Sequence, residues 1–247
     1  MPWIRVGSAL CGEAAGAGEV IEATKNAIAS RGIKAQVSRV GCIGLCFAEP
    51  LLDIQLPGQS RVFYGNVDPE SVDQIIESHL GRKTPLSDLA LGWLGDNPVD
   101  GVNYLNDHPM KIKENRVALR NAGHIDPSDV YQYIYNGGYS ALNKALFEGS
   151  PEDTLEQVNL SGLRGRGGAA FATATKWRFL AGSNAPVKYV LCNCEEGDPG
   201  AFNDKGILES DPHTVLEGII LAGYATGSRY GYIFIRHGHD GPILQAQ

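Results

Sequence analysis

The sequence predicts an α/β protein built from two parts in succession. In the first 80 residues, helical and strand patterns follow one another in the order β-α-β-β-β-α. From residue 111 onward, helical patterns lead into a second alternation of helices and strands. Such alternation is typical of layered α/β architectures. A chain of 247 residues, 43% hydrophobic and 20% charged, also suits two domains better than one.

Residues 1–80 are expected to form one small domain. Apolar and β-branched runs predict strands, and residues 13–30 carry Ala, Val and Ile at helical spacing. Asp68 is placed to cap a second helix over 68–80. The predicted strands are "WIRV", "AQVSRV", "LLDIQL" and "RVFYGNV", an order similar to a thioredoxin-like sheet. Residues 81–110 are rich in Gly, Pro, Asn and Asp and are expected to be a linker.

Residues 111–247 form the second predicted domain, and its first part, 111–161, is a helical lead-in. Two short helices are expected there, each opened by an Asp or Ser cap with a proline in its first turn. The part from 162 to 247 is predicted to contain the helix "AFATATKWRFLAG", the strand "VKYVLCN", the helix "DPHTVLEGIILAGYATG" and the strand "YGYIFIRH". The last residues, "GPILQAQ", are interpreted as the start of a further helix, so we expect a fragment.

Composition narrows the classes of partner. The formal net charge is -7 and no basic run is present, which argues against a nucleic-acid partner. No apolar run reaches the roughly 18 residues of a membrane span, so direct membrane insertion is not expected. The N-terminus lacks the apolar core of a secretory signal, which favours a cytoplasmic location. The five cysteines are then expected as thiols or metal ligands.

A glycine loop, "GLRGRGGAAFATATK" at 162–176, is the first candidate site. It holds four glycines and two arginines before its first alanine. Clustered glycines let successive N–H groups converge on an anion, and the helix that follows points its positive end the same way. Arg164, Arg166 and Lys176 add formal charge there. The loop therefore favours a phosphate site, against the alternative of a solvated surface loop.

The same loop matches the dinucleotide fingerprint G-x-G-x-x-A through Gly165, Gly167 and Ala170. That fingerprint needs a strand immediately before it, whereas the preceding residues have the pattern of a polar helix and turn. The P-loop pattern also fails, because no Gly-Lys-Ser/Thr closes it. A Rossmann-type dehydrogenase is therefore disfavoured, and the presence or absence of a strand before residue 162 decides the matter.

An acidic turn, "CNCEEGDPGAFND" at 192–204, is the second candidate site. Its three carboxylates, Glu195, Glu196 and Asp198, would ordinarily indicate a solvated loop. In an α/β layer, however, the carboxyl end of a strand is the edge where ligands bind. A basic glycine loop together with an acidic turn suits a flavin nucleotide that meets a nicotinamide.

The motifs "SGLRGRGGAAFATATKW" and "CNCEEGDPGAFNDKGILESDPHTVLEG" resemble the FMN- and NADH-binding flavin subunit of bacterial complex I and its relatives in soluble NAD(P)-linked hydrogenases and formate dehydrogenases. "VALRNAGHIDPSDVYQYIYNGGYSALNKAL" is similar to the lead-in of that group, so the resemblance covers about 111 to 236. It implies that NADH gives a hydride to FMN, and that single electrons pass on to iron–sulfur clusters of partner subunits. It also implies a cytoplasmic protein, at most peripheral to a membrane complex.

The resemblance implies which residues hold each nucleotide. Phe171 and Phe179, eight apart and so on one helical face, would stack on the adenine of NADH. Asp198 would lie near the adenosine ribose and disfavour the extra phosphate of NADP, so NAD is the expected substrate. The expected FMN-binding residues are Gly165, Arg166, Gly167, Gly168, Lys176, Asn193, Glu195 and Glu196.

The sequence departs from the family pattern in three ways. The usual Phe-Pro-Thr-Gly is "FATA" at 171–174, and alanine would cost stability if the last position needs a positive φ. The usual acidic order Asp, Glu, Glu becomes Glu, Glu, Asp. The family's further Gly-Glu-Glu motif, and its cysteine-rich domain for a [4Fe–4S] cluster, have no counterpart before Gln247. The chain thus carries about half of a flavin site.

The N-terminal part resembles the thioredoxin-like ferredoxin often fused to such subunits, whose pattern is Cys-x4-Cys and then Cys-x3-Cys. Cys11, Cys42 and Cys46 fill three of these places, and Gly16 stands in the fourth. A [2Fe–2S] cluster usually takes four thiolates, so three could hold one only with a water, a carboxylate or another substitute. Otherwise the domain is a relic with leftover cysteines. Cys192 and Cys194 are not accompanied by further residues at the spacing of a metal site.

Two functions therefore compete. The first is the flavin subunit of a multi-subunit NADH:acceptor oxidoreductase, whose partners are other iron–sulfur subunits. The alternative is a non-catalytic fragment or assembly subunit, in which the incomplete flavin domain only docks partners. Binding of FMN separates the two.

Overall fold

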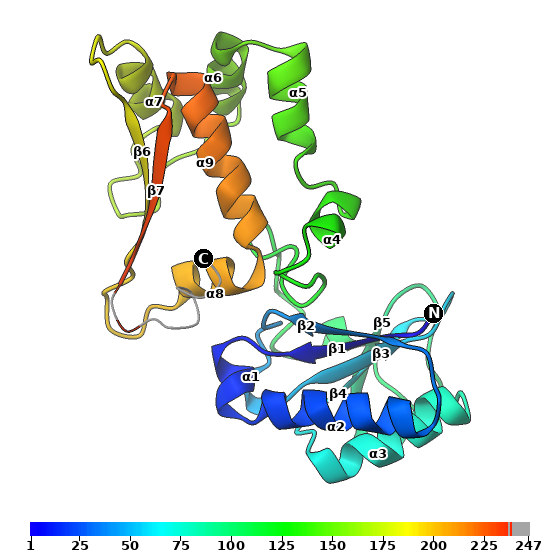
Figure 1. Cartoon of the computed structure of the whole chain (residues 1–247). Coiled ribbons are helices and arrows are strands. Elements are labelled where there is room, and N and C mark those ends of the chain that lie inside the picture. The colour runs from blue at the N-terminus through cyan, green and yellow to red at the C-terminus, as the bar shows by residue number, and fades with distance from the viewer. Residues whose placement is uncertain (237, 239–247) are drawn as a thin grey trace. The chain divides into compact units, whose positions relative to one another are not determined.

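The computed structural model describes residues 1–236 and 238 (Figure 1). It divides into two compact units. Unit 1 comprises Met1–Ser128 with Glu209–Asp211, and unit 2 comprises Asp129–Leu208 and the residues from Pro212 onward. Both units combine helices with a sheet, which confirms the predicted α/β class.

Unit 1 is organised around a five-stranded sheet in the order β2-β1-β3-β4-β5 (Figure 1). β1 and β2 are parallel, and the pairs β1–β3, β3–β4 and β4–β5 are antiparallel. The predicted thioredoxin-like order β-α-β-β-β-α is confirmed, with one added short helix, α1. The strands are β1 (Trp3–Gly7), β2 (Gln36–Val40), β3 (Leu52–Gln55), β4 (Arg61–Tyr64) and β5 (Ala90–Leu94).

The helices of unit 1 are α1 (Leu10–Ala14), α2 (Ala17–Ser30) and α3 (Pro69–Ile76), and α2 and α3 cover the same face of the sheet (Figure 1). The predicted cap is present, because the Asp68 carboxylate accepts from the Ser71 amide at 2.8 Å and the Asp68 amide donates to Ser71 Oγ at 3.0 Å. Such a reciprocal pair satisfies amides that have no partner inside the helix. Shorter helical turns lie at η1 (Cys46–Ala48), η2 (Glu77–Gly81), η3 (Ser87–Leu89) and η4 (Leu105–Asp107).

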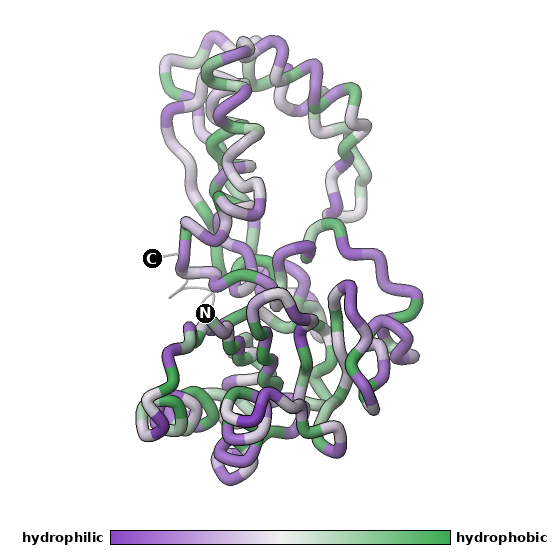
Figure 2. The backbone as a smooth tube through the Cα atoms, turned by 90° about the vertical axis from the view of Figure 1, so that its right-hand side faces the viewer, coloured by the Kyte–Doolittle hydropathy of each residue, from purple (hydrophilic) through white to green (hydrophobic). Residues whose placement is uncertain are grey.

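Two apolar clusters hold unit 1 together. Alternate strand residues, among them Ile4, Ile54 and Val62, pack with α2 and α3 in the larger cluster. The opposite face of the sheet packs in part on a second cluster that includes Phe63 and Leu105. Because successive side chains of a strand point to opposite faces, both faces of this sheet are buried. The alternation of hydrophobic and hydrophilic residues along the chain is visible in Figure 2.

The expected linker at 81–110 is wrong in its central part. Residues 90–94 form β5, which pairs with β4 at the edge of the sheet, and the segment up to Ser128 clusters with unit 1. The Gly, Pro and Asp residues on either side mark turns that lead into and out of the strand. The helical lead-in accordingly begins at α4 (Val130–Tyr135) rather than at residue 111.

Unit 2 contains helices and a parallel pair of strands, β6 (Tyr189–Cys194) and β7 (Tyr230–Ile235). α9 is part of the segment that connects β6 to β7, and it packs on both strands. α6 and α7 pack on each other and on α9 (Figure 1). The helices are α4 (Val130–Tyr135), α5 (Ser140–Glu148), α6 (Pro151–Leu160), α7 (Thr173–Ala181), α8 (Asn203–Ser210) and α9 (Pro212–Thr226).

Most of the elements predicted in this region are present, with two differences. The first lead-in helix is split into α4 and α5, because Gly137 and Tyr139 take positive φ values of 86° and 58°. α8 lies where the sequence analysis expected only an acidic turn and its continuation. The predicted helix start at "GPILQAQ" lies outside the described residues.

Candidate functional site

The glycine loop is closed at its base and open at its tip. The Gly165 amide donates to the Phe171 carbonyl at 2.8 Å, and the Thr173 amide donates to the Leu163 carbonyl at 3.0 Å. Between these bonds, the backbone amides of 166–170 have no hydrogen-bond partner in the described part of the chain. Gly168 and Ala170 have φ values of 98° and 48°, which turn the tip back on itself. The loop thus presents a row of free N–H donors.

Helix α7 begins directly after this loop. Its N-cap, Ala172, provides no side-chain acceptor, so the first-turn amides are left to other partners. The loop side chain Arg166 and the α7 side chain Lys176 are exposed and make no hydrogen bond or ion pair within residues 1–236 and 238. Amides, a helix N-terminus and two cations at one loop form an arrangement suited to a phosphate.

The cost expected for alanine at position 174 does not arise. Ala174 lies inside α7, is 2% exposed and has no positive φ. Alanine is the residue that favours a helix most, so this departure from the family pattern stabilises α7.

The prediction that Phe171 and Phe179 share one helical face is wrong. α7 starts at Thr173, so Phe171 belongs to the loop and helical spacing does not apply to it. The two rings are exposed by 47% and 70%. Each ring is therefore exposed enough to stack on a flat ligand. Because only Phe179 lies on α7, the eight-residue spacing does not place the two rings on one surface.

The acidic turn follows β6, and its two glutamates differ in surroundings. The Glu196 carboxylate accepts from the amides of Asp204 at 2.7 Å and Lys205 at 2.9 Å, and only 4% of its side chain is exposed. Glu196 therefore caps the start of α8. Glu195 lies 3.8 Å from Arg236 across the ends of β6 and β7, and 37% of its side chain is exposed.

The other predicted residues of this turn remain on the surface. Asn193 accepts from the Glu195 amide through Oδ1 at 3.1 Å, which fixes the direction of its amide group. The Asp198 carbonyl accepts from the Ala201 amide in a turn, and its carboxylate is exposed. No hydrogen bond or ion pair among the described residues joins the glycine loop to the acidic turn.

The three N-terminal cysteines gather in unit 1. The Sγ atoms of Cys42 and Cys46 are 3.7 Å apart. A hydrogen bond with Cys46, followed by burial, raises the pKa of Cys11 to about 11. Burial raises the pKa of Cys42 to about 12. At neutral pH these two groups are therefore thiols rather than thiolates.

A buried carboxyl, which the sequence analysis missed, lies close to these thiols. Glu49 is 7% exposed, and its charge acts on both Cys11 and Cys42. Burial raises the pKa of Glu49 to about 7, although the Leu51 amide donates to Oε2 at 2.8 Å. Its Oε1 is buried without a partner among the described residues. Its place three residues after Cys46 was the available signal.

These groups do not make a closed metal site as they stand. Gly16 supplies no side chain at the fourth position, and it has a φ of 99°. No set of three or more His, Cys, Asp or Glu side chains in the described chain has the geometry to hold a metal ion. The three thiols are therefore gathered, and a [2Fe–2S] cluster with four ligands would need a fourth ligand besides them.

Unit 2 thus combines an α/β fold with a glycine loop suited to a phosphate. Residues 158–245 match the family model described as Nuo51 FMN-binding domain. This match confirms the predicted resemblance to FMN-binding flavin subunits over that segment.

Curated relatives are similar over the same part of the chain. The NADP-reducing hydrogenase subunit HndC of Solidesulfovibrio fructosivorans is 46% identical over 124 residues, which is 50% of this chain and 25% of that protein. An NADH-quinone oxidoreductase subunit of Rhizobium meliloti is 45% identical over 120 residues, 49% of this chain and 28% of that protein. The chain spans about a quarter of the length of these relatives.

Two solved structures are similar to the model. An NAD+-reducing [NiFe]-hydrogenase matches 99% of this chain and 39% of its own, with 23% identity and a TM-score of 0.43. A thioredoxin-like [2Fe-2S] ferredoxin from Aquifex aeolicus matches 37% of this chain and 97% of its own, with 24% identity and a TM-score of 0.32. No helix in the described residues is long and apolar enough to cross a bilayer.

Proposed function

We propose that this chain is the front part of the flavin subunit of an NADH:acceptor oxidoreductase. In this function NADH passes a hydride to FMN, and single electrons continue to iron–sulfur clusters of partner subunits. The observation that carries the proposal is the open tip of the glycine loop, where five successive amides at 166–170 lack partners among the described residues. The loop lies within the segment that matches an FMN-binding family.

The residues of the loop suit the phosphate end of FMN. The amides of Arg166, Gly167 and Gly168 would donate to phosphate oxygens, while the Arg166 and Lys176 side chains balance the charge. Bound FMN supplies the chemistry that the chain itself lacks, because a flavin accepts two electrons at once and releases them singly. The protein's part is to hold and orient it.

The acidic turn suits the polar edge of the nucleotides. Asn193 and Glu195 are exposed or half-buried at the end of β6, where they can accept or donate hydrogen bonds. Glu196 would contribute by holding α8 in place rather than by touching FMN. Phe171 and Phe179 offer exposed rings to the adenine of NADH.

NAD is the proposed substrate in preference to NADP. Asp198 carries an exposed carboxylate, which would repel the extra phosphate of NADP if it lies beside the adenosine ribose. One relative, HndC, is by contrast named as a subunit of an NADP-reducing hydrogenase. The variant Asp198→Asn should lower the ratio of the oxidation rate with NADH to the oxidation rate with NADPH, because it removes the repelling charge.

The proposed partners are other iron–sulfur subunits of a cytoplasmic complex, which could be peripheral to a membrane. The relatives are named as subunits of a hydrogenase and of a quinone oxidoreductase. In this proposal, electrons leave FMN through iron–sulfur clusters that the partner subunits hold.

The competing function is a non-catalytic assembly subunit, in which the glycine loop would bind no flavin. Titration of the full chain with FMN, followed by flavin fluorescence, decides between the two. We expect binding that Arg166→Gln weakens by about tenfold, the value of one charge-assisted bond to a phosphate. Arg229→Gln, which changes another arginine of unit 2 outside the glycine loop, is the matched control.

Addition of NADH completes the test. Bleaching of the flavin absorption band at about 450 nm supports the oxidoreductase, because the reduced flavin no longer absorbs there. Wild-type protein that does not bind FMN, or that binds it no better than Arg166→Gln does, contradicts the proposal and leaves the assembly subunit.

A further inference from the structure

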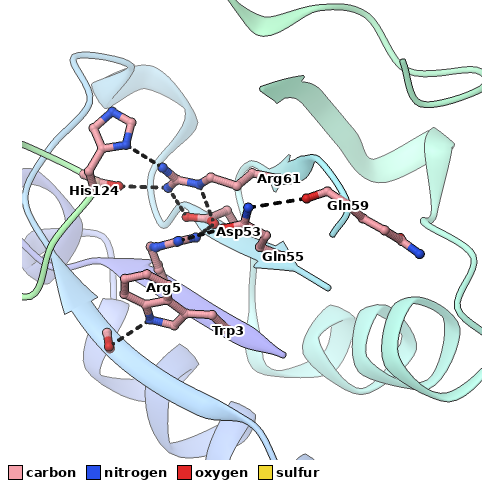
Figure 3. Close-up of polar contacts among 9 residues, drawn as sticks. Trp3, Arg5, Asp53, Gln55, Gln59, Arg61 and His124 are labelled. Carbon is pink, nitrogen blue, oxygen red and sulfur yellow. Dashed lines mark hydrogen bonds and ion pairs between the residues drawn. The ribbon is translucent and has the colours of Figure 1, made fainter. Parts of the chain in front are cut away.

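The face of the unit 1 sheet that lies opposite α2 and α3 carries buried charges. Arg5 stands directly across from Asp53 in the β1–β3 register, and Arg61 lies on the neighbouring strand β4 (Figure 3). Arg5, Asp53 and Arg61 are 3%, 3% and 6% exposed. Alternation along the strands places these residues on one face, where they meet each other instead of solvent.

The charges on this face do not balance. Asp53 Oδ1 accepts from Arg5 at 2.7 Å and from Arg61 Nε at 3.0 Å, and Oδ2 accepts from Arg61 at 2.7 Å. One carboxylate thus serves two guanidinium groups. Burial lowers the pKa of Arg5 to about 10, so Arg5 is still charged at neutral pH. A buried excess of positive charge is costly unless an anion comes near it.

His124 extends the network with a defined tautomer. Arg61 can only donate, so its 2.8 Å contact with His124 Nδ1 makes that nitrogen an acceptor (Figure 3). The ring is therefore neutral and carries its proton on Nε2. Loss of hydration, then the charges of Arg61 and Arg5, lowers the pKa of His124, although part of the residue is exposed. Nε2 has no hydrogen-bond acceptor within 1–236 and 238.

A cavity of about 380 Å³ opens beside these residues, entirely within unit 1. Arg61, Lys111, Arg116 and Arg120 line it together with His124. Its one carboxylate, Glu114, is already bonded by Lys111 and by Arg116 Nε, the latter at 2.7 Å. The remaining wall is mostly apolar and includes Phe63, Leu94, Leu105 and Ile112.

We propose that this cavity binds a small organic phosphate monoester. Arg5, Arg61, Lys111 and Arg116 carry four positive charges against the two carboxylates of Asp53 and Glu114, so a dianion matches the excess charge better than a single carboxylate would. The apolar wall would pack against the organic group of such an ester, and inorganic phosphate has no such group. The volume lies in the range of small-molecule sites, roughly 300 to 1,000 Å³. The Arg61 side chain, anchored by Asp53, gives the site a fixed donor.

Titration of the full chain with phenyl phosphate tests the proposal, with benzenesulfonate and inorganic phosphate as comparisons. Benzenesulfonate has the ring but only one charge, and inorganic phosphate has the charge without the ring. We expect one phenyl phosphate per chain in this cavity, bound at least about tenfold more tightly than either comparison. Binding is followed by the NMR signals of the His124 ring, which report on this cavity alone.

Variants separate this site from the glycine loop. Arg116→Gln should weaken phenyl phosphate binding at the His124 signals by about tenfold. Arg82→Gln, an exposed arginine of unit 1 outside the cavity, should leave it unchanged. Arg166→Gln should also leave it unchanged, because that residue belongs to the proposed FMN site. Circular dichroism shows whether each variant is folded.

Three results would overturn the proposal. The first is an unperturbed His124 ring at millimolar phenyl phosphate in the wild-type chain, a result that needs no variant. The second is equal affinity for benzenesulfonate, which would exclude a requirement for a dianion. The third is loss of the His124 response in Arg166→Gln, which would assign the binding to the glycine loop. Failure here leaves the FMN titration unaffected.

Discussion

Arg61 binds Asp53 through two hydrogen bonds, from Nε to Oδ1 at 3.0 Å and from a terminal nitrogen to Oδ2 at 2.7 Å. The fork of the guanidinium matches the two oxygens of a carboxylate, so the pair holds both strands in fixed register. Arg5 shares Oδ1 from the other side. Asp53 is thus the anion that links β1, β3 and β4.

Asp53→Asn should destabilise unit 1 strongly. The substitution leaves two buried guanidinium groups without a charged partner, a loss of about 3 to 5 kcal/mol. Urea denaturation in a Trp177→Phe background measures it, because the remaining tryptophans, Trp3 and Trp93, both report on unit 1. Asp73→Asn is the matched control, because Asp73 pairs with Arg31 on the surface and should leave the midpoint nearly unchanged. Equal midpoints for the two variants would contradict the prediction.

Unit 1 should lose stability in acid because of His79. The ring is 1% exposed, and burial lowers its pKa from 6.5 to about 4. The unfolded chain therefore takes up a proton before the folded chain does, so stability declines as the pH falls from about 6.5 to about 4. The slope is up to about 1.4 kcal/mol per pH unit.

The variant His79→Gln tests this source of pH dependence. Tyr64 accepts from the Leu86 amide at 3.3 Å and can donate to His79 Nδ1 at 2.9 Å, a bond that the glutamine oxygen could accept. Urea midpoints between pH 4 and pH 7 should therefore vary less in the variant than in the wild type. An unchanged slope would assign the effect to His124 or to another group.

Substitutions of Glu195 and Glu196 in the acidic turn should have different effects. Glu196→Ala should destabilise the start of α8 by about 1 kcal/mol, the usual value of a lost cap. Hydrogen exchange at the Asp204 and Lys205 amides measures this, because both donate to Glu196. Glu195→Ala should leave that exchange unchanged but weaken FMN binding. Faster exchange in Glu195→Ala would show that the two residues act together.

Gly16→Cys should complete the fourth thiol position of the Cys11, Cys42 and Cys46 group. A Cβ at this position meets nothing within 4 Å, although a φ of 99° strains any residue other than glycine, at a cost of about 1 kcal/mol. After anaerobic treatment with iron and sulfide, we expect two irons per chain in the variant. Gly18→Cys, on the first turn of α2, is the control. Equal iron in wild type and variant would show that three cysteines suffice.

The sequence analysis succeeded where local pattern and tertiary role agree. "RVFYGNV" and "VKYVLCN" carry β-branched and aromatic residues and are strands, and the Asp68 cap is present. β5 was missed because "ALGWL" is short and lies between turn residues. α8 was missed because Gly206 interrupts a polar pattern with little apolar periodicity.

The charged face of unit 1 could not be predicted from local pattern alone. An arginine or aspartate within a strand ordinarily points to solvent, and nothing in "WIRV" or "LLDIQL" says that residues near 105 and 123 cover that face. The available signal was the position of Arg5 and Asp53 between apolar neighbours. In the candidate site, the loop's free amides followed from its glycines, whereas the role of Glu196 depended on α8.

The parallel pairing of β6 with β7 has a consequence for the order of folding. Two parallel strands cannot be joined by a tight turn. The connection from β6 to β7 contains α8 and α9, so the strands can pair only when this long segment has brought their ends together. The entropy of closing that long connection is lost before any strand contact compensates for it. β3 and β4, by contrast, are joined by a short turn. In stopped-flow refolding, the tryptophan emission of unit 1, measured in Trp177→Phe, should therefore reach its native value earlier than the emission of Trp177 on α7, measured in a chain with Trp3→Phe and Trp93→Phe.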